Sequence, residues 1–364
     1  MDKKKRRARI FPIWVRISFI VTALFVILAL IAPRSRALAD FVNSYISTPI
    51  RVSMSFLSGF IPFSLFEIFF ILLLPALLLL IVLLVRSTKT LASALRRILS
   101  ILGVVSILFS GYLAVMTIPY NTTPISVHLS IKDGDVDADE IYRATVIARD
   151  EVNRLAEELT GEGVTEFPYS REELSKMISD AYARVSEEVP FFYAFDSTYK
   201  EIINAGIMSD MGIAGIYMYI TGEANVNTLY PDYDTTFSAA HELAHQRGIN
   251  RENEANFMAF YVLSESEDVY LRYSAYLNIY EYLASALYRS DKALYAKVRD
   301  GLNPRAVKDI AASQAITREH QQSPLFELMN KVNDAYLKSN GTEGVVTYGY
   351  VARLAAQYLL YGRG

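Results

Sequence analysis

The segment His241-Glu242-Leu243-Ala244-His245 has the pattern HExxH and holds two of the four histidines in the chain. On a helix, residues i and i+4 lie on one face, so both imidazoles can bind one zinc ion. Glu242 follows the first histidine, where its carboxylate can take a proton from a zinc-bound water. The pattern predicts a zinc-dependent peptide hydrolase with Glu242 as general base.

The residues on either side of the motif favour a helix. Asp234, Thr235 and Thr236 are candidate N-caps, and Gly248 stands where a left-handed residue ends a helix. The alternative is an ordinary amphipathic helix whose histidines are four apart by chance. With so few histidines, that coincidence is expected in fewer than about one such chain in a hundred.

A tetrahedral zinc bound by two histidines and one water needs a third protein ligand, most often a carboxylate. Glu252 and Glu254 follow the turn at Gly248 and begin a second helix. Being two residues apart, they point in different directions, and only one can face the metal. We favour Glu252, because Asn256 lies one turn further on, where its amide can orient a ligating histidine. Glu254 is the alternative ligand, and a solvated charge at a helix start is the simpler explanation of either acid.

The first third of the chain, residues 1–118, is predicted to be a membrane region. Apolar stretches cover about residues 10–32, 60–85 and 98–118, each close to the roughly twenty residues that cross a bilayer. Glu67 lies inside the second stretch. A carboxylate there indicates either a functional group or a hydrogen-bond partner of a neighbouring helix.

Basic residues predict the orientation of these spans. The basic block at residues 3–9 and the basic loop at residues 86–97 should stay in the cytoplasm, which places residues 119–364 outside. A cleaved N-terminal signal peptide would lead to the same placement. Three arginines between the first two spans weaken the bias: Arg34, Arg36 and Arg51. We expect a multi-pass protein of a bacterial cell membrane.

Residues 119–364 are the size of one domain, with ample apolar side chains for a core. A net charge of −3 gives no sign of nucleic-acid binding, and the lack of cysteine excludes a thiol nucleophile. Gly215–Ile220 is predicted to be a strand that binds the substrate backbone, or else an ordinary hairpin strand. The other elements should be helices, at about residues 137–159, 171–189, 252–266, 268–288, 291–299, 305–320, 324–339 and 346–361.

These features predict a mainly α fold: three transmembrane helices, then an extracytoplasmic, mostly helical zincin-like α+β domain with a small sheet. His128 and His320 are far from the motif in sequence. His320 could donate to the oxyanion of a tetrahedral intermediate, although a surface role is the simpler expectation.

Several segments resemble a bacterial membrane family, domain of unknown function 3810. They are Pro62-Phe63-Ser64, His241–Phe257, the run from Asn330 to Gly341, Gly344-Val345 and Tyr348-Gly349. The resemblance implies a zinc metallopeptidase of the cell membrane. A looser similarity is to zinc peptidases with HExxH and a following ExxA[DN] helix, including the CAAX-prenyl-protease and phage-repressor-cleaving types. It implies Glu252 as third ligand and Asn256 as its partner, with a shorter gap after His245 than in those families.

The expected function is hydrolysis of a peptide or protein substrate at the membrane, with Zn²⁺ as cofactor and the lipid bilayer as the other partner. The alternative is a non-catalytic envelope sensor or assembly protein with a structural or vestigial zinc site. An intact Glu242 argues against that alternative, because a structural zinc site has no need of a general base.

Overall fold

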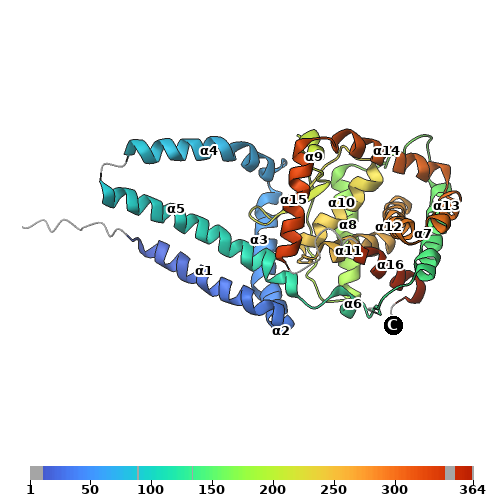
Figure 1. The fold of residues 1–364 in the computed structure, drawn as a ribbon, viewed down its shortest axis with the longest axis horizontal. Helices are drawn as coiled ribbons and strands as arrows, with labels where there is room; N and C mark the ends of the chain where they lie inside the picture. Colours follow the sequence, from blue (N-terminus) through green and yellow to red (C-terminus); the bar gives the residue numbers. More distant parts are fainter. Residues whose placement is uncertain (1–10, 88–89, 133, 341–348, 363–364) are drawn as a thin grey trace, which may run out of the picture.

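The structure is a computed structural model that describes residues 11–87, 90–132, 134–340 and 349–362. The basic block at residues 3–9, Lys89 and the resembling segments within residues 341–348 lie outside the described residues. The described chain is mainly helical. Three long apolar helices extend from one side of a helical domain that contains a small sheet (Figure 1).

Three described helices are long and apolar enough to cross a membrane: α1 (Ile13–Ile31), α4 (Leu65–Ser87) and α5 (Leu91–Tyr112). The π-helical turn η3 (Leu113–Thr117) and the short 3₁₀ helix η4 (Pro119–Asn121) continue α5 into the domain. The three predicted apolar helices are thus confirmed, with different bounds. Residues 60–64 form a turn before α4, and α5 begins earlier than predicted. α1 packs along α5, whereas α4 diverges from that pair toward the domain (Figure 1).

The segment between α1 and α4 is also helical, which was not predicted. It consists of η1 (Ala32–Arg34), α2 (Arg36–Val42), the π-helical turn η2 (Asn43–Ser47) and α3 (Thr48–Gly59). α3 lies across the direction of the apolar helices, against the domain (Figure 1). This segment therefore links two of the apolar helices in sequence and also packs on the helical domain.

The helical domain is built around α10 and α11, which pack on each other and on α12. α7, α12 and α16 form a second layer beside them. The helix bounds are α6 (Ile125–His128), α7 (Ala138–Glu158), α8 (Arg171–Glu188), α9 (Ala205–Asp210), α10 (Asp232–Gln246), α11 (Glu252–Ser264), α12 (Val269–Ser290), α13 (Lys292–Arg299), α14 (Pro304–His320), α15 (Pro324–Ser339) and α16 (Gly349–Tyr361). The eight helices predicted outside the motif are confirmed to within a few residues.

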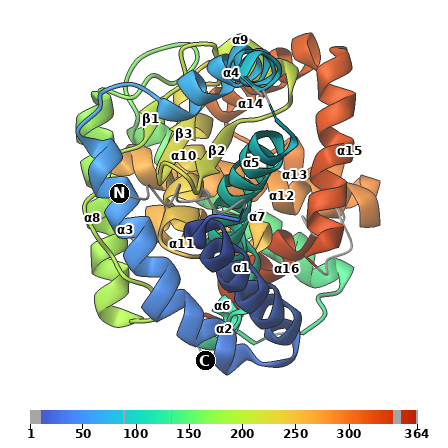
Figure 2. The same ribbon diagram turned by 90° about the vertical axis from the view of Figure 1, so that its left-hand side faces the viewer.

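The sheet has the strand order β1-β3-β2, with β1 (Lys200–Glu201) parallel and β2 (Gly215–Met218) antiparallel to β3 (Glu223–Val226). The predicted strand at Gly215 is confirmed, although it ends at Met218. β2 pairs with β3 along one side only, so it is an edge strand. Viewed along the apolar helices, β2 and β3 lie behind them, next to α10 (Figure 2).

Carboxylates fix the first turn of α4 to the domain. Glu223 of β3 accepts the backbone N–H groups of Leu65 (3.2 Å) and Phe66 (3.0 Å), where the helix dipole favours negative charge. Glu67 accepts the backbone N–H groups of Ile203 (3.0 Å) and Asn204 (2.7 Å), just before α9. Two roles were considered for Glu67, a functional group or a hydrogen-bond partner of a neighbouring helix. The structure shows Glu67 as a hydrogen-bond partner of the segment before α9.

Candidate metal centre

α10 carries the HExxH segment and begins at Asp232, with Pro231 as the N-cap residue. The predicted N-caps at residues 234–236 are therefore wrong, because these residues lie within the helix. Asp232 and Asp234 occupy its first turn, where their charge suits the positive end of the helix dipole. α10 packs on β2, β3, α11 and α12, so its motif-bearing turns are held from several sides.

The turn after α10 orients the second histidine. Gly248 has φ of +97°, as predicted for the left-handed residue that ends the helix. The chain then folds back, and the Ile249 carbonyl lies 2.7 Å from His245 Nδ1. Because a carbonyl can only accept, Nδ1 must carry the proton, and the lone pair of Nε2 is left for a metal.

His241, His245 and Glu252 converge at the junction of α10 and α11. The two Nε2 atoms are 3.0 Å apart, and the Glu252 carboxylate lies 3.3 Å from His241 Nε2 and 3.6 Å from His245 Nε2. The imidazole planes are perpendicular to each other. One ligand atom from each of the three residues thus lies within 4.8 Å of the other two.

The spacing of these atoms fits a tetrahedral zinc. Bonds of about 2.0–2.1 Å at tetrahedral angles place neighbouring ligand atoms about 3.3 Å apart. The two Nε2 atoms are slightly closer than this, and Glu252 approaches the histidines through different oxygens, Oε2 toward His241 (3.3 Å) and Oε1 toward His245 (3.6 Å). Among the described residues, this group contains three potential ligands. Three protein ligands leave one coordination position for water, as in catalytic rather than structural zinc sites.

Electrostatics keeps the carboxylate ionised. Burial alone would raise the pKa of Glu252, but the adjacent histidines outweigh burial and hold that pKa well below its usual range. Burial likewise would lower the pKa of His245, and the Glu252 carboxylate reverses this, raising it to about 9. Without a metal, the carboxylate therefore stabilises a proton on His245 Nε2. A divalent cation bound there would displace that proton, and the same carboxylate would stabilise the cation's charge.

Glu242 lies between α10 and the edge of β2. Its side chain is buried, and burial raises the pKa of the carboxyl, opposed by the nearby histidines. The backbone of Tyr217 in β2 acts in the opposite direction to burial and lowers the pKa of this carboxyl. Gly215 is also close: a Cβ there would lie 2.6 Å from Glu242 Oε1. Only glycine lets the strand approach the carboxylate this closely.

Comparison with known proteins identifies a family. The sequence model of a family described as "Protein of unknown function (DUF3810)" matches residues 43–356. The chain belongs to this family. Comparisons with curated proteins and with solved structures gave no match. The region matched to DUF3810 contains η2, α3, α4, α5 and all three members of the candidate metal centre.

Two predicted residues of this DUF3810 member have other contacts. Glu254, the alternative ligand, accepts the backbone N–H of Ile125 (3.2 Å) and binds the Arg251 guanidinium (2.5 Å), away from the histidines. Asn256 donates to the backbone carbonyl of Glu252 at 2.9 Å, rather than to a histidine. The Ile249 carbonyl takes the orienting role expected of Asn256, at least for His245.

The other two histidines lie outside the group of three. His128 stacks on Phe191, with ring centroids 4.4 Å apart. His320, at the end of α14, pairs with Asp210 at 2.7 Å between Nδ1 and Oδ1. His128 therefore has a role in packing, and His320 has a role in an ion pair.

Sequence reasoning missed one long-range support of the turn after α10. Arg51 of α3 is 1% exposed. Its guanidinium donates to Asn43 Oδ1 (2.7 Å), the Val115 carbonyl (2.6 Å) and Asn250 Oδ1 (3.2 Å). A Cβ at Gly248 would lie 2.8 Å from the same guanidinium. No local pattern around Arg51 signals these contacts, since Val115 and Asn250 come from distant segments and Asn43 lies in the preceding helical turn.

Proposed function

We propose that this protein is a membrane-anchored zinc metallopeptidase, with His241, His245 and Glu252 as ligands and Glu242 as general base. The observation that supports it most is the group of His241, His245 and Glu252, in which one ligand atom from each residue lies within 4.8 Å of the other two. Three protein ligands around one zinc would leave a position for water. Zinc bound there would supply an acidified water and a Lewis acid for the peptide carbonyl.

The chain's own groups account for the remaining steps. Glu242 takes the proton of the attacking water and later gives it to the leaving amine. The close backbone of Gly215 in β2 limits the positions that its carboxylate can take. The unpaired side of β2 offers backbone groups to which an extended peptide can add as a further strand.

We infer the placement of the helical domain outside the membrane from charge. Of the three arginines that oppose the positive-inside rule, Arg51 is buried among protein groups and is not a loop charge. Only Arg34 and Arg36 remain exposed in that segment. The basic residues at 3–9 and 86–97 outnumber these three arginines, which favours a cytoplasmic N-terminus.

Paired substitutions test the peptidase. In the full-length protein, Glu242→Gln should retain zinc and lose hydrolysis of a peptide library followed by mass spectrometry, whereas His245→Ala should lose both. Glu172→Gln, an exposed carboxylate on α8, is the matched control and should retain both. Full hydrolysis by Glu242→Gln would contradict the general-base role. Bound zinc with a fourth protein ligand and no hydrolysis would favour a structural site in a sensor or assembly protein.

A further inference from the structure

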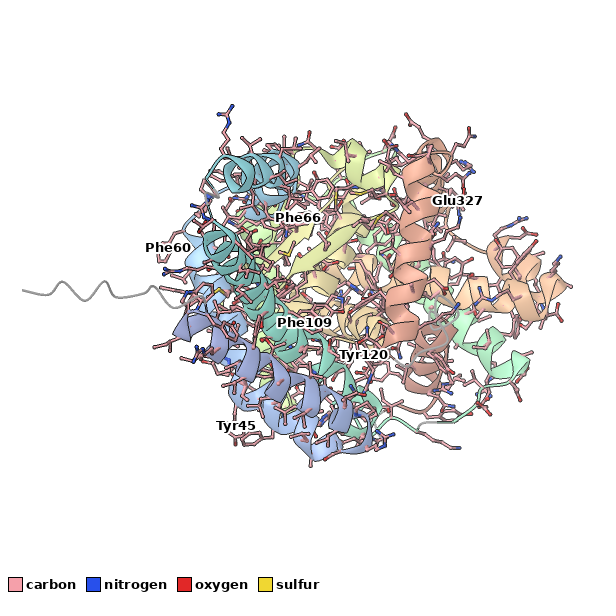
Figure 3. The ribbon with its side chains drawn as sticks, turned by 60° about the vertical axis from the view of Figure 1, so that its left-hand side comes forward. Tyr45, Phe60, Phe66, Phe109, Tyr120 and Glu327 are labelled. Atoms are coloured by element: carbon pink, nitrogen blue, oxygen red, sulfur yellow. The ribbon has the colours of Figure 1, made fainter. Side chains whose placement is uncertain are left out.

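The surface of α15 has three distinct faces. Leu325, Leu328 and Val332 follow an i, i+3, i+7 spacing, so they form one stripe, and they are 42%, 55% and 49% exposed. Glu327 and Lys331 lie on a second, charged face and pair with each other at 2.6 Å. Figure 3 shows Glu327 on the side of α15 turned away from α5.

The third face holds α15 to the domain without using that stripe. Leu337 is fully buried, and the Phe326 ring lies so close to Gly212 that a Cβ there would be 2.7 Å from it. Met329 packs on an apolar cluster that includes Phe66. The stripe of Leu325, Leu328 and Val332 therefore stays exposed although α15 packs on the domain through its third face.

Two contacts place α15 where the apolar helices meet the domain. Phe66, which shares a cluster with Met329, is in the first turn of α4. Tyr336 contacts Tyr120 of η4, at the end of the third candidate span, with ring centroids 6.5 Å apart. α15 thus reaches from the start of one candidate span to the end of another, and it runs across their direction (Figure 1).

Other exposed apolar side chains lie at the same junction. Glu67, in the first turn of α4, accepts the backbone N–H of Asn204. Ile203, the residue before Asn204, is 80% exposed. Phe60 lies just before α4 and is also exposed. Large exposed apolar patches on proteins usually mark interaction sites. Here the exposed apolar side chains lie close to the domain ends of the candidate spans, although on separate elements.

We propose that α15 is an interfacial helix, whose Leu325, Leu328 and Val332 stripe inserts into the lipid surface at the domain end of the membrane spans. Burial of such a stripe in the boundary between headgroups and acyl chains is favourable, while the charged flank stays in water. The proposal depends on the candidate spans and not on the peptidase activity, so the two can fail separately.

Lipid quenching of a single tryptophan tests this. Trp14 is the only tryptophan in the chain, so a Trp14→Phe background carries either Leu328→Trp or Asn330→Trp, the latter on the opposite side of α15. The full-length proteins are reconstituted into phosphatidylcholine vesicles with a nitroxide near the top of the acyl chain. Quenching should be at least about twofold greater at position 328 than at position 330.

Equal quenching at the two positions would overturn the proposal. So would quenching at position 328 that falls as more protein is added per vesicle, because a second copy would then cover the stripe. Circular dichroism checks that each variant is folded. Val332→Trp, on the same stripe, replaces Leu328→Trp in the comparison if the latter does not fold.

Discussion

The α10–α11 hairpin and the α2–α3 segment meet at the turn that ends α10, yet they differ in how they form the site. The hairpin supplies all three candidate ligands from one short stretch, residues 241–252. The α2–α3 segment supplies a buried guanidinium from about 200 positions earlier in the chain. The candidate ligands are thus close together in sequence. The Arg51 side chain that supports the turn after them is distant in sequence and connects the candidate metal centre to the membrane half of the chain.

Removing a ligand should have the largest effect in this comparison. Glu252→Gln removes the anionic ligand and should weaken zinc binding by more than about a hundredfold, with loss of hydrolysis. Glu254→Gln is the matched control, since Glu254 binds Ile125 and Arg251 instead. Zinc content after dialysis against a graded chelator measures the difference. Equal zinc loss in the two variants would show that Glu252 is no more important for zinc binding than Glu254.

Disrupting the distant support should have an intermediate effect. Arg51→Met leaves the acceptors at Asn43 and Asn250 without their donor and should lower the free energy of unfolding by about 1–3 kcal/mol. The loss is limited because the substitution also removes the cost of burying the charge, which lowers the pKa of Arg51 to about 10. Thermal unfolding of the detergent-solubilised protein measures the change.

Arg36→Met, at an exposed position of α2, is the control for that experiment and should leave unfolding unchanged. Zinc affinity should also fall by about tenfold in Arg51→Met, because the turn bearing Ile249 loses a neighbour. An Arg51→Met protein with wild-type stability and zinc affinity would show that the α2–α3 segment does not support the centre.

The same contrast explains what the sequence could and could not predict. The HExxH helix, the turn at Gly248 and most helices of the domain follow from local periodicity and capping, and their positions were predicted closely. α3 was missed because its buried residues are polar (Arg51, Ser55 and Ser58) while Phe56 and Leu57 are exposed, which reverses the pattern of an ordinary amphipathic helix. The acceptors of the Arg51 guanidinium come from η2, η3 and the α10–α11 turn, and spacing along the chain cannot indicate such pairs.

The predicted N-caps of α10 failed for a related reason. Several residues before the motif can cap a helix, but α10 begins earlier, at Asp232, after Pro231 with no side-chain cap. The Glu252 carboxylate was favoured on local grounds, and the structure places it beside both histidines. The histidine-orienting group was expected to be the Asn256 side chain, but a backbone carbonyl holds His245, and backbone contacts leave no mark in a sequence.

A third substitution examines the contact between the edge strand and the general base, and its expected effect is the smallest. Gly215→Ala places a Cβ within 2.6 Å of Glu242 Oε1, so the carboxylate must shift. Hydrolysis should fall by about tenfold while zinc content stays at the wild-type level, since no ligand is touched. Gly206→Ala, where a Cβ meets no atom within 4 Å, controls for the loss of a glycine. A Gly215→Ala protein with wild-type hydrolysis would mean that the position of Glu242 does not depend on β2, and that the local hairpin alone sets the geometry of the general base.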